Sequence, residues 1–317
     1  MAGLTKKYMV TGGAGFIGSH IVDTLVEKGF DVVIVDNLST GKTENINPKA
    51  VFCNLDIRNL EDIKPVFKGI DCVFHLAAQP RIQPSIIDPL ASHSNNVVGI
   101  MNVLLAARDA GVKKFVYSAS SAAYGDQDRL PLTEDMIPRP KTPYSLFKLA
   151  GEEYCKLFSM LYNLPTVSLR YFNVYGPRQL CEGAYSTVIG VFLKQKKEGR
   201  PLTIVGNGEI SRDFTHVRDV VRANLLAMES DKVGKGEVIN IGAGSSHTVN
   251  EIAAFIGSNT INIPPRPGEA RITLADTNRA KELLGWKSTI TVEEGINELK
   301  KIMIEEAVEE LKRLMGT

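Results

Sequence analysis

The fold is decided by the stretch Gly12-Gly13-Ala14-Gly15-Phe16-Ile17-Gly18. An apolar run, Tyr8-Met9-Val10, comes just before it, and apolar residues follow it at a spacing typical of one helix face: Ile17, Ile21, Val22 and Leu25. The pattern predicts a strand, a tight turn and a helix. Glycines in such a turn let the backbone pass close to a diphosphate, and the N–H groups at the helix start face its negative charge.

A second predicted strand, Val32–Val35, ends in an acidic residue, Asp36. A carboxylate at this strand end is placed to hold the ribose hydroxyls of a dinucleotide. Asn37 follows at a position where an NADP site would favour arginine, so the pattern indicates NAD. A glycine-rich loop alone would be an ordinary structural turn, but the combination predicts an α/β Rossmann fold with a doubly wound parallel sheet.

Composition and charge exclude several classes of protein. The 317 residues, 44% of them hydrophobic, are enough to bury a full core divided over two lobes. The 37 basic and 36 acidic residues leave a net charge of +1, so no broad field favours nucleic acid or a membrane surface. The four cysteines lack the close spacing of a zinc or redox site, so we expect reduced thiols and no metal. The first strand starts by Tyr8, too early for a signal peptide, and no apolar run is long enough to cross a bilayer, so we expect a soluble cytoplasmic protein.

Further predicted strands carry candidate contacts at their ends. Asp56 follows a short apolar stretch and is placed to reach an adenine amino group, although an ordinary helix cap is the alternative. A strand at 72–76 leads into two small residues, Ala77 and Ala78, which let a ligand approach the backbone. His75 lies inside that strand, where a hydrogen-bonded core histidine is favoured over a catalytic one.

A serine cluster and a tyrosine–lysine pair form the catalytic signal. The predicted strand 114–117 delivers the sequence Ser-Ala-Ser-Ser at 118–121, at the edge where parallel sheets bind ligands. Pro143 suits the first position of a helix running to about residue 162, from which Tyr144 and Lys148 project on one face. This spacing is common on solvated helices, but together with the serines and the dinucleotide turn it predicts a catalytic site.

The chain is expected to divide near Gly176-Pro177, after a predicted strand at 166–172. A predicted helix at 218–228 and a strand at 238–241 return to the first lobe, and an amphipathic helix at 292–315 closes the chain. We therefore predict an NAD-binding Rossmann lobe and a smaller α/β substrate-binding lobe, formed by residues 1–175 plus about 215–242 and by about 176–214 plus 243–317.

These motifs together resemble the extended short-chain dehydrogenase/reductase superfamily: Gly12-x-x-Gly15-x-x-Gly18, Asp36, Ser120, Tyr144-x-x-x-Lys148 and Arg170-Tyr171-Phe172-Asn173-Val174-Tyr175-Gly176-Pro177. Within it the chain is most similar, from about Lys7 to Trp286, to UDP-hexose 4-epimerases, especially the branch acting on N-acetylated sugars. The resemblance implies an isomerase with tightly bound NAD that inverts C4 of a UDP-hexose through a 4-keto sugar. The implied substrates are UDP-GlcNAc and UDP-GalNAc, with UDP-glucose and UDP-galactose as further candidates.

The resemblance assigns catalytic roles to three residues. Tyr144 is the expected base, since a nearby lysine ammonium and an oxidised nicotinamide would both pull the pKa of a phenol below its usual ~10. Lys148 is its electrostatic partner and the anchor of the nicotinamide ribose, and NAD is the hydride store. Ser120 falls where the family places a serine or threonine that bridges the sugar hydroxyl and Tyr144, with Ser121 as the alternative.

The resemblance also implies which residues contact the two ligands. The expected cofactor residues are Gly12, Gly15, Phe16, Ile17, Gly18, Asp36, Asn37, Asp56, Ile57, Leu76, Ala77, Ala78, Asn96, Ser118, Tyr144, Lys148 and Phe172. The expected substrate residues are Ser120, Ser121, Tyr144, Asn173, Val188, Arg212, Arg266, Glu269 and Thr273.

For four of these expected substrate residues, the chemistry or size of the side chain supports the assignment. Arg212 and Arg266 suit a diphosphate because each presents a planar fork of donors, although surface salt bridges are the ordinary alternative. Glu269 would hold a ribose hydroxyl, where many relatives have the shorter Asp. Thr273 falls where a tyrosine closes the sugar pocket in relatives restricted to glucose and galactose, and the smaller side chain leaves space for an N-acetyl group.

Several alternatives stay open. Ser121 and Ala122 follow Ser120, so the carboxylate that dehydratases and decarboxylases of this frame use there is missing. An epimerase of UDP-glucuronate remains, although no cationic site for its carboxylate is located. From other classes, a non-catalytic NAD-binding sensor would have no need of Ser120, Tyr144 and Lys148 together, and a net-oxidising dehydrogenase would release NADH.

The resemblance finally implies a homodimer, formed through a four-helix bundle from the predicted helices at 95–107 and 144–162. Some galactose-type epimerases carry a lysine near the nicotinamide ribose where this chain has Gln79-Pro80-Arg81. No role is assigned to Arg81 on this ground.

Overall fold

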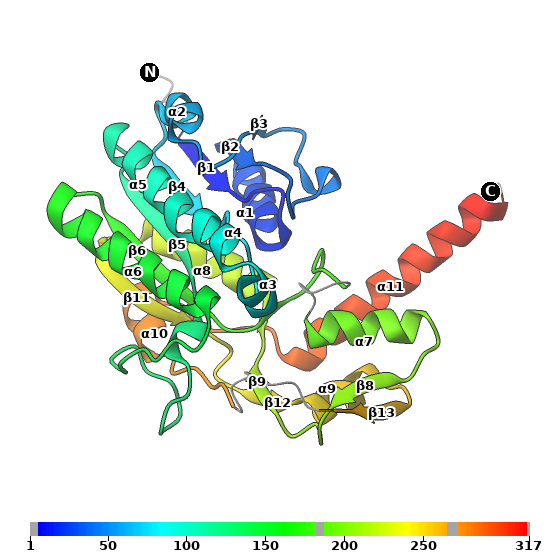
Figure 1. The fold of residues 1–317 in the computed structure, drawn as a ribbon. Coiled ribbons are helices and arrows are strands. Elements are labelled where there is room, and N and C mark those ends of the chain that lie inside the picture. The colour runs from blue at the N-terminus through cyan, green and yellow to red at the C-terminus, as the bar shows by residue number, and fades with distance from the viewer. Residues whose placement is uncertain (1–5, 182–186, 265–271, 316–317) are drawn as a thin grey trace.

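The computed structural model describes residues 6–181, 187–264 and 272–315. At its centre lies a seven-stranded parallel sheet (Figure 1). Its strand order is β11 (Lys235–Ile241), β6 (Thr166–Tyr171), β5 (Lys114–Ser120), β4 (Cys72–His75), β1 (Lys7–Thr11), β2 (Asp31–Asp36) and β3 (Val51–Asn54). The strand order reverses between β1 and β4, where sheets of this kind bind ligands beyond their carboxyl ends. The predicted doubly wound sheet is confirmed.

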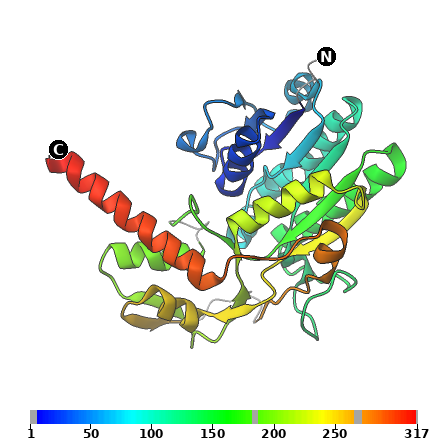
Figure 2. The same ribbon diagram turned by 180° about the vertical axis from the view of Figure 1, so that it is seen from behind.

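Helices cover both faces of the sheet (Figures 1 and 2). One face carries α1 (Phe16–Glu27) and α8 (Val217–Glu229), and the other carries α5 (Gly99–Asp109) and α6 (Pro143–Tyr162). Neighbouring strand residues point to opposite faces, so Val10 and Ile34 join the first core while Met9 and Val33 join the second. Burial on both faces explains why these strands are apolar without alternation.

Several predicted elements have different bounds, among them the strand predicted at 114–117 and the helix predicted at 95–107. β5 continues to Ser120, because Ser118 and Ser120 pair with β6 opposite Leu169 and Tyr171. The predicted helix at 95–107 begins as a π-helical segment, η3 (Ser94–Val98), which precedes α5. Single π-helical turns are often found at functional sites, where they redirect one side chain. The helices ending at Tyr162 and spanning Val292–Met315 have their predicted bounds.

Short elements connect the strands of the sheet. They are η1 (Thr43–Asn45), α2 (Leu60–Ile63), η2 (Lys64–Phe67), α3 (Ile82–Ile87), α4 (Pro89–His93) and η4 (Ser121–Tyr124). Of these, α3 and η4 lie after β4 and β5, so they border the carboxyl edge of the sheet, where the candidate site lies.

A smaller lobe has its own core. Its elements are β7 (Val174–Tyr175), α7 (Val188–Lys197), β8 (Leu202–Val205), β9 (Ser211–Asp213), β10 (Thr215–His216), β12 (Ser246–Thr248), α9 (Val249–Ile256), β13 (Thr260–Ile263) and α11 (Val292–Met315). They form three two-stranded sheets, β7 with β10, β8 with β13 and β9 with β12. The first turns of α11 bury Ile296 against α7 and α9, and the rest of this helix extends away from the body (Figure 2).

The two lobes are not consecutive segments of the chain. We propose the division given by the sequence, in which α8 and β11 return to the first lobe, except that β7 and its partner β10 go with the smaller lobe, because Tyr175 packs in the core of that lobe. The packing adds α10 (Asn278–Leu284) and Trp286, whose buried side chains join the core beneath α8. Among the described residues, no helix is both long and apolar enough to span a membrane.

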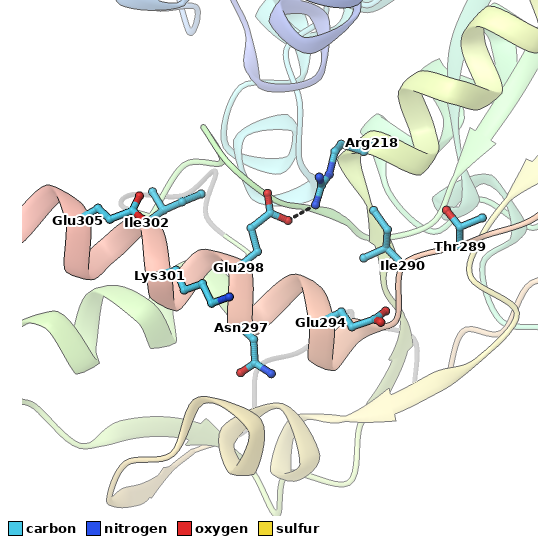
Figure 3. Close-up of a pocket in the computed structure, with 9 residues that line it drawn as sticks. All are labelled: Arg218, Thr289, Ile290, Glu294, Asn297, Glu298, Lys301, Ile302 and Glu305. Carbon is cyan, nitrogen blue, oxygen red and sulfur yellow. Dashed lines mark hydrogen bonds and ion pairs between the residues drawn. The ribbon is translucent and has the colours of Figure 1, made fainter.

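An open pocket of about 680 Å³ lies where α11 meets the start of α8 (Figure 3). At its edge Arg218 of α8 forms an ion pair with Glu298 of α11. None of its lining residues is a predicted site residue.

Candidate active site

The glycine turn leaves no room for side chains. Gly12 has a φ of +73°, and a Cβ there would lie 2.7 Å from the backbone nitrogen of Ala77. A Cβ on Gly18 would lie 2.1 Å from the carbonyl oxygen of Gly12. In the described part of the chain no side chain caps α1 at Gly15, and its first turn holds no acidic residue. The turn therefore offers backbone N–H groups and the positive end of the helix dipole to an anion.

Asp36 ends β2 beside this turn. Its side chain is buried; one carboxylate oxygen accepts from the N–H of Ala14 at 3.0 Å and the other from that of Leu38 at 2.8 Å. The carboxylate thus ties the glycine turn to the end of β2. Contact with a ribose remains a prediction, and the location agrees with it.

Asp56 is held by its neighbours. It accepts from Asn37 at 3.0 Å and from the guanidinium of Arg58, whose hydrogen bonds lower the pKa of Asp56 to about 2. The cap of α2 is Asn59, so the alternative interpretation of Asp56 as a helix cap is wrong. Its contact with adenine stays a prediction. Ile57 is buried beside it, against Gly99.

The segment after β4 passes directly over the glycine turn. Leu76 and Ala77 lie within 3 Å of where a Cβ on Gly12 would be, and Ala78 follows them. Asn96, buried in η3, accepts from the N–H of Gln79 at 2.7 Å and donates to its carbonyl at 3.0 Å. Asn96 thus fixes the backbone that follows Ala78, and its contact with the cofactor stays a prediction.

His75 is confirmed as a hydrogen-bonded core histidine. Its Nδ1 lies 2.7 Å from the hydroxyl of Thr11, and its ring stacks on Tyr117. Burial lowers its pKa to about 3, and the charge of Lys148 acts in the same direction. Neutral at any physiological pH, it is a structural residue.

The start of α6 carries the candidate catalytic pair. Thr142 and Ser145 form a reciprocal capping box, and Pro143 takes the first helical position, as predicted. One turn on, the ammonium of Lys148 donates to the carbonyl of Ser118 at 2.7 Å and lies 5.0 Å from the ring centre of Tyr117. Burial lowers the pKa of Lys148 to about 8.

Tyr144 is surrounded by polar groups from other elements. Burial raises its pKa, while hydrogen bonding with Ser120 and the positive charge of Arg81 oppose the rise. From the sequence we expect a lowered pKa for Tyr144, caused by Lys148 and nicotinamide. Within the chain the direction is the reverse, because burial outweighs the polar neighbours and the ammonium of Lys148 is directed at Ser118.

Three of the predicted substrate residues meet around Asp213. The amide of Asn173 donates to the carbonyl of Asp213 at 3.1 Å and to the hydroxyl of Thr273 at 3.3 Å. Arg212 lies on β9 beside Asp213. Arg266 and Glu269 lie outside the described residues. The structure therefore brings Asn173, Arg212 and Thr273 together.

The other predicted residues occupy the ends of elements around the site. Phe16 and Ile17 open α1, Ser121 opens η4 and Val188 opens α7. Phe172, fully buried at the end of β6, packs beside the ring of Tyr124 at 6.3 Å between centroids.

Sequence reasoning missed two carboxylates near the site. Glu152, one turn after Lys148, forms a buried ion pair with Arg170 of β6, and its four-residue spacing was a signal that could have found it. Asp213 accepts from the N–H groups of Ala243, Gly244 and Ala275. No sequence signal marks Asp213, because its donors come from distant segments.

A family model, described as the NAD dependent epimerase/dehydratase family, matches residues 8–242. The chain belongs to this family. A putative UDP-glucose 4-epimerase of Methanocaldococcus jannaschii is 42% identical over 299 residues, covering 92% of this chain and 96% of the relative.

Solved structures of 4-epimerases are also similar to this chain. A UDP-glucose 4-epimerase from Thermotoga maritima with UDP-glucose is 40% identical, with a TM-score of 0.90 and coverage of 96% of this chain and 99% of the other. A UDP-N-acetylglucosamine 4-epimerase from Methanobrevibacter ruminantium, in complex with UDP-N-acetylmuramic acid, is 36% identical, with a TM-score of 0.90 and coverage of 95% and 99%.

Membership establishes the class of enzyme. This epimerase is an NAD-dependent isomerase of the UDP-sugar 4-epimerase family. Its own residues fit the cofactor, since the turn at Gly12 admits no side chain and the buried carboxylate of Asp36 lies beside it. The predicted family, fold and cofactor are confirmed.

Proposed function

We propose that this epimerase inverts C4 of UDP-GlcNAc and UDP-GalNAc and also accepts UDP-glucose and UDP-galactose. One observation carries the proposal. Ser120 and Tyr144 interact at the carboxyl edge of the sheet, with Lys148 one turn further along α6. The glycine turn follows β1 at the same edge, which supports a sugar carbon and a nicotinamide being bound next to each other there.

The residues of the chain then divide the chemistry. The glycine turn and Asp36 would hold NAD, which would supply a reversible hydride acceptor for C4 of the sugar. Tyr144, as phenolate, takes the proton of the C4 hydroxyl through Ser120 and gives it back after the sugar has turned over. Lys148 contributes a positive charge beneath the site, held in place by the carbonyl of Ser118.

The proposal is tested by offering three substrates separately. The purified enzyme is incubated with UDP-GlcNAc, UDP-glucose or UDP-glucuronate, without added cofactor, and the products are separated. We expect UDP-GalNAc to form with the highest kcat/KM. Faster conversion of UDP-glucuronate would support that rival substrate instead. Bound NAD without any conversion would indicate a sensor, and accumulating NADH would indicate a net dehydrogenase.

Thr273 is the proposed determinant of the sugar. Its hydroxyl accepts from Asn173 at 3.3 Å and from the N–H of Asp213 at 3.3 Å, so the small side chain is fixed among the predicted substrate residues. We expect Thr273→Tyr to lower kcat/KM for UDP-GlcNAc about tenfold or more relative to UDP-glucose. The bulky side chain would clash with the N-acetyl group of the larger sugar, and overpacking of this kind costs ~1–3 kcal/mol. Thr273→Ser keeps the hydroxyl and should leave the ratio unchanged. An unchanged ratio in Thr273→Tyr would contradict this role.

We also propose a homodimer formed through α5 and α6, which lie side by side on one face (Figure 1). The outer surface of α6 exposes large apolar side chains, with Leu157 41% and Met160 67% accessible. Burying such a surface in an interface of about 1,200–2,000 Å² favours association.

Charges on this surface should break the dimer. We expect Leu157→Asp combined with Met160→Asp to sediment as a monomer, while the parent sediments as a dimer. Val308→Asp, at a 45% exposed position on α11, is the matched control and should stay dimeric. A monomeric parent at micromolar concentration would contradict the proposal.

A further inference from the structure

Asp213 is a buried carboxylate that joins three segments of the chain. It ends β9, and its side chain is fully buried. Its Oδ1 accepts from the N–H of Ala243 at 2.6 Å, and its Oδ2 accepts from the N–H of Gly244 at 3.0 Å and from that of Ala275 at 3.1 Å. The loop after β11 and the segment after Thr273 are thereby both tied to β9.

The packing around this carboxylate is close. A Cβ on Gly242 would lie 2.9 Å from Oδ2 of Asp213 and 2.4 Å from the Cβ of Ala275. The loop after β11 therefore approaches Asp213 through a glycine. A carboxylate suits this place because both of its oxygens only accept, whereas an amide would turn its NH2 group toward at least one backbone N–H.

The backbone of Asp213 contacts predicted substrate residues. Its N–H donates to the hydroxyl of Thr273 at 3.3 Å, and its carbonyl accepts from the amide of Asn173 at 3.1 Å. Asn173 has a φ of +28°, a conformation that persists outside glycine only where the surroundings impose it. Side chains alternate along a strand, so Arg212 leaves β9 on the face opposite the anchored carboxylate. All three predicted substrate residues thus adjoin the residue that the carboxylate fixes.

We propose that Asp213 is a positioning residue whose carboxylate anchors β9 and thereby holds the three predicted substrate residues in place for a UDP-sugar. The inference rests on the proposed function, which assigns those residues to the substrate. Asp213 is buried and acts through them, so it is not assigned a contact with the ligand. The proposed catalytic residues lie on β5 and α6. Loss of the anchor should therefore weaken substrate binding more than it slows the chemical step.

The test compares Asp213→Asn with a matched control, Asp219→Asn. Asp219 is also buried and accepts from two backbone N–H groups, those of Thr289 at 2.9 Å and Ile290 at 3.0 Å, but neither partner is a predicted site residue. For each purified variant, calorimetry gives the dissociation constant of UDP, and initial rates with UDP-GlcNAc give kcat and KM. Thermal unfolding reports stability.

The two variants should differ in binding and not in folding alone. In Asp213→Asn we expect the dissociation constant of UDP and the KM to rise about tenfold, the equivalent of one lost hydrogen bond to a charged group, with kcat within about threefold of the parent. Asp219→Asn should lose stability but bind UDP as the parent does. Gly242→Ala keeps the carboxylate but places a methyl group against it, so it should weaken UDP binding in the same direction.

Parental affinity for UDP in Asp213→Asn, or in Gly242→Ala if only that variant folds, would overturn the role of Asp213. A loss of kcat at unchanged affinity would overturn it too, since a purely structural defect would not act on binding. The calorimetry needs no turnover, so it decides on Asp213 whichever sugar is preferred. Failure of the proposed function would be seen separately, as a parent that binds UDP without converting UDP-GlcNAc.

Discussion

Replacing Tyr144 with phenylalanine should lower kcat for UDP-GlcNAc by about 10²–10⁴-fold, the usual contribution of a general acid–base group. The variant removes only the phenol oxygen that interacts with Ser120. The N–H of Tyr144 keeps its bond to Ser85, and the capping box of α6 is untouched. Loss of rate in a folded protein would therefore report loss of the proton acceptor. The measurement is initial rate at saturating substrate.

A second tyrosine on the same helix is the control. Tyr162 ends α6 and is 47% exposed, so Tyr162→Phe removes a phenol far from the serine cluster. It should turn over at the parental rate, and both variants should retain the same amount of bound NAD. If Tyr144→Phe matched Tyr162→Phe in rate, Tyr144 would not be the base.

Replacing Arg170 with methionine should destabilise the fold by ~3–5 kcal/mol, the cost of leaving one partner of a buried ion pair alone. Arg170 donates to both oxygens of Glu152, at 2.9 and 2.6 Å, and the two side chains are 3% and 1% exposed. Its guanidinium also lies 4.5 Å from the ring centre of Tyr124. The measurement is the shift of the denaturant midpoint at constant slope.

The loss of folding stability in Arg170→Met should depend on pH in a defined direction. Burial raises the pKa of Glu152, and the hydrogen bonds of Arg170 oppose this rise. Without Arg170 the folded-state pKa lies above the unfolded value, so the neutral form is favoured in the fold. Stability of the variant is then retained at low pH and lost as the pH rises through the folded-state pKa.

An exposed pair provides the comparison. Lys113 forms an ion pair with Asp71 at 2.6 Å, but its side chain is 77% exposed. Lys113→Met should cost no more than about 1 kcal/mol, because solvent screens such pairs. If Arg170→Met destabilised the fold no more than Lys113→Met, the burial of the Arg170–Glu152 ion pair would not make its loss more costly than that of an exposed pair.

Local patterns predicted much of the site. The glycine turn, Asp36 and the helix that begins at Pro143 are each determined by a few consecutive residues, so the sequence was sufficient to place them. Tertiary packing decided the rest. The direction of the pKa of Tyr144 depends on burial, and the donors to Asp213 are contributed by segments far away in the chain. Neither property can be predicted from a periodicity or a residue spacing in the sequence.

The late position of β11 in the chain bears on biosynthesis. β11 hydrogen bonds to β6, yet α7 and the strands β7 to β10 of the smaller lobe are synthesised between the two. The edge of β6 therefore stays without its neighbour until that intervening region has emerged from the ribosome, and long-range pairing of this kind forms slowly. The nucleotide-binding half cannot mature as an autonomous unit ahead of its companion, and a protease cut at the junction after Gly176 would not release two independent halves.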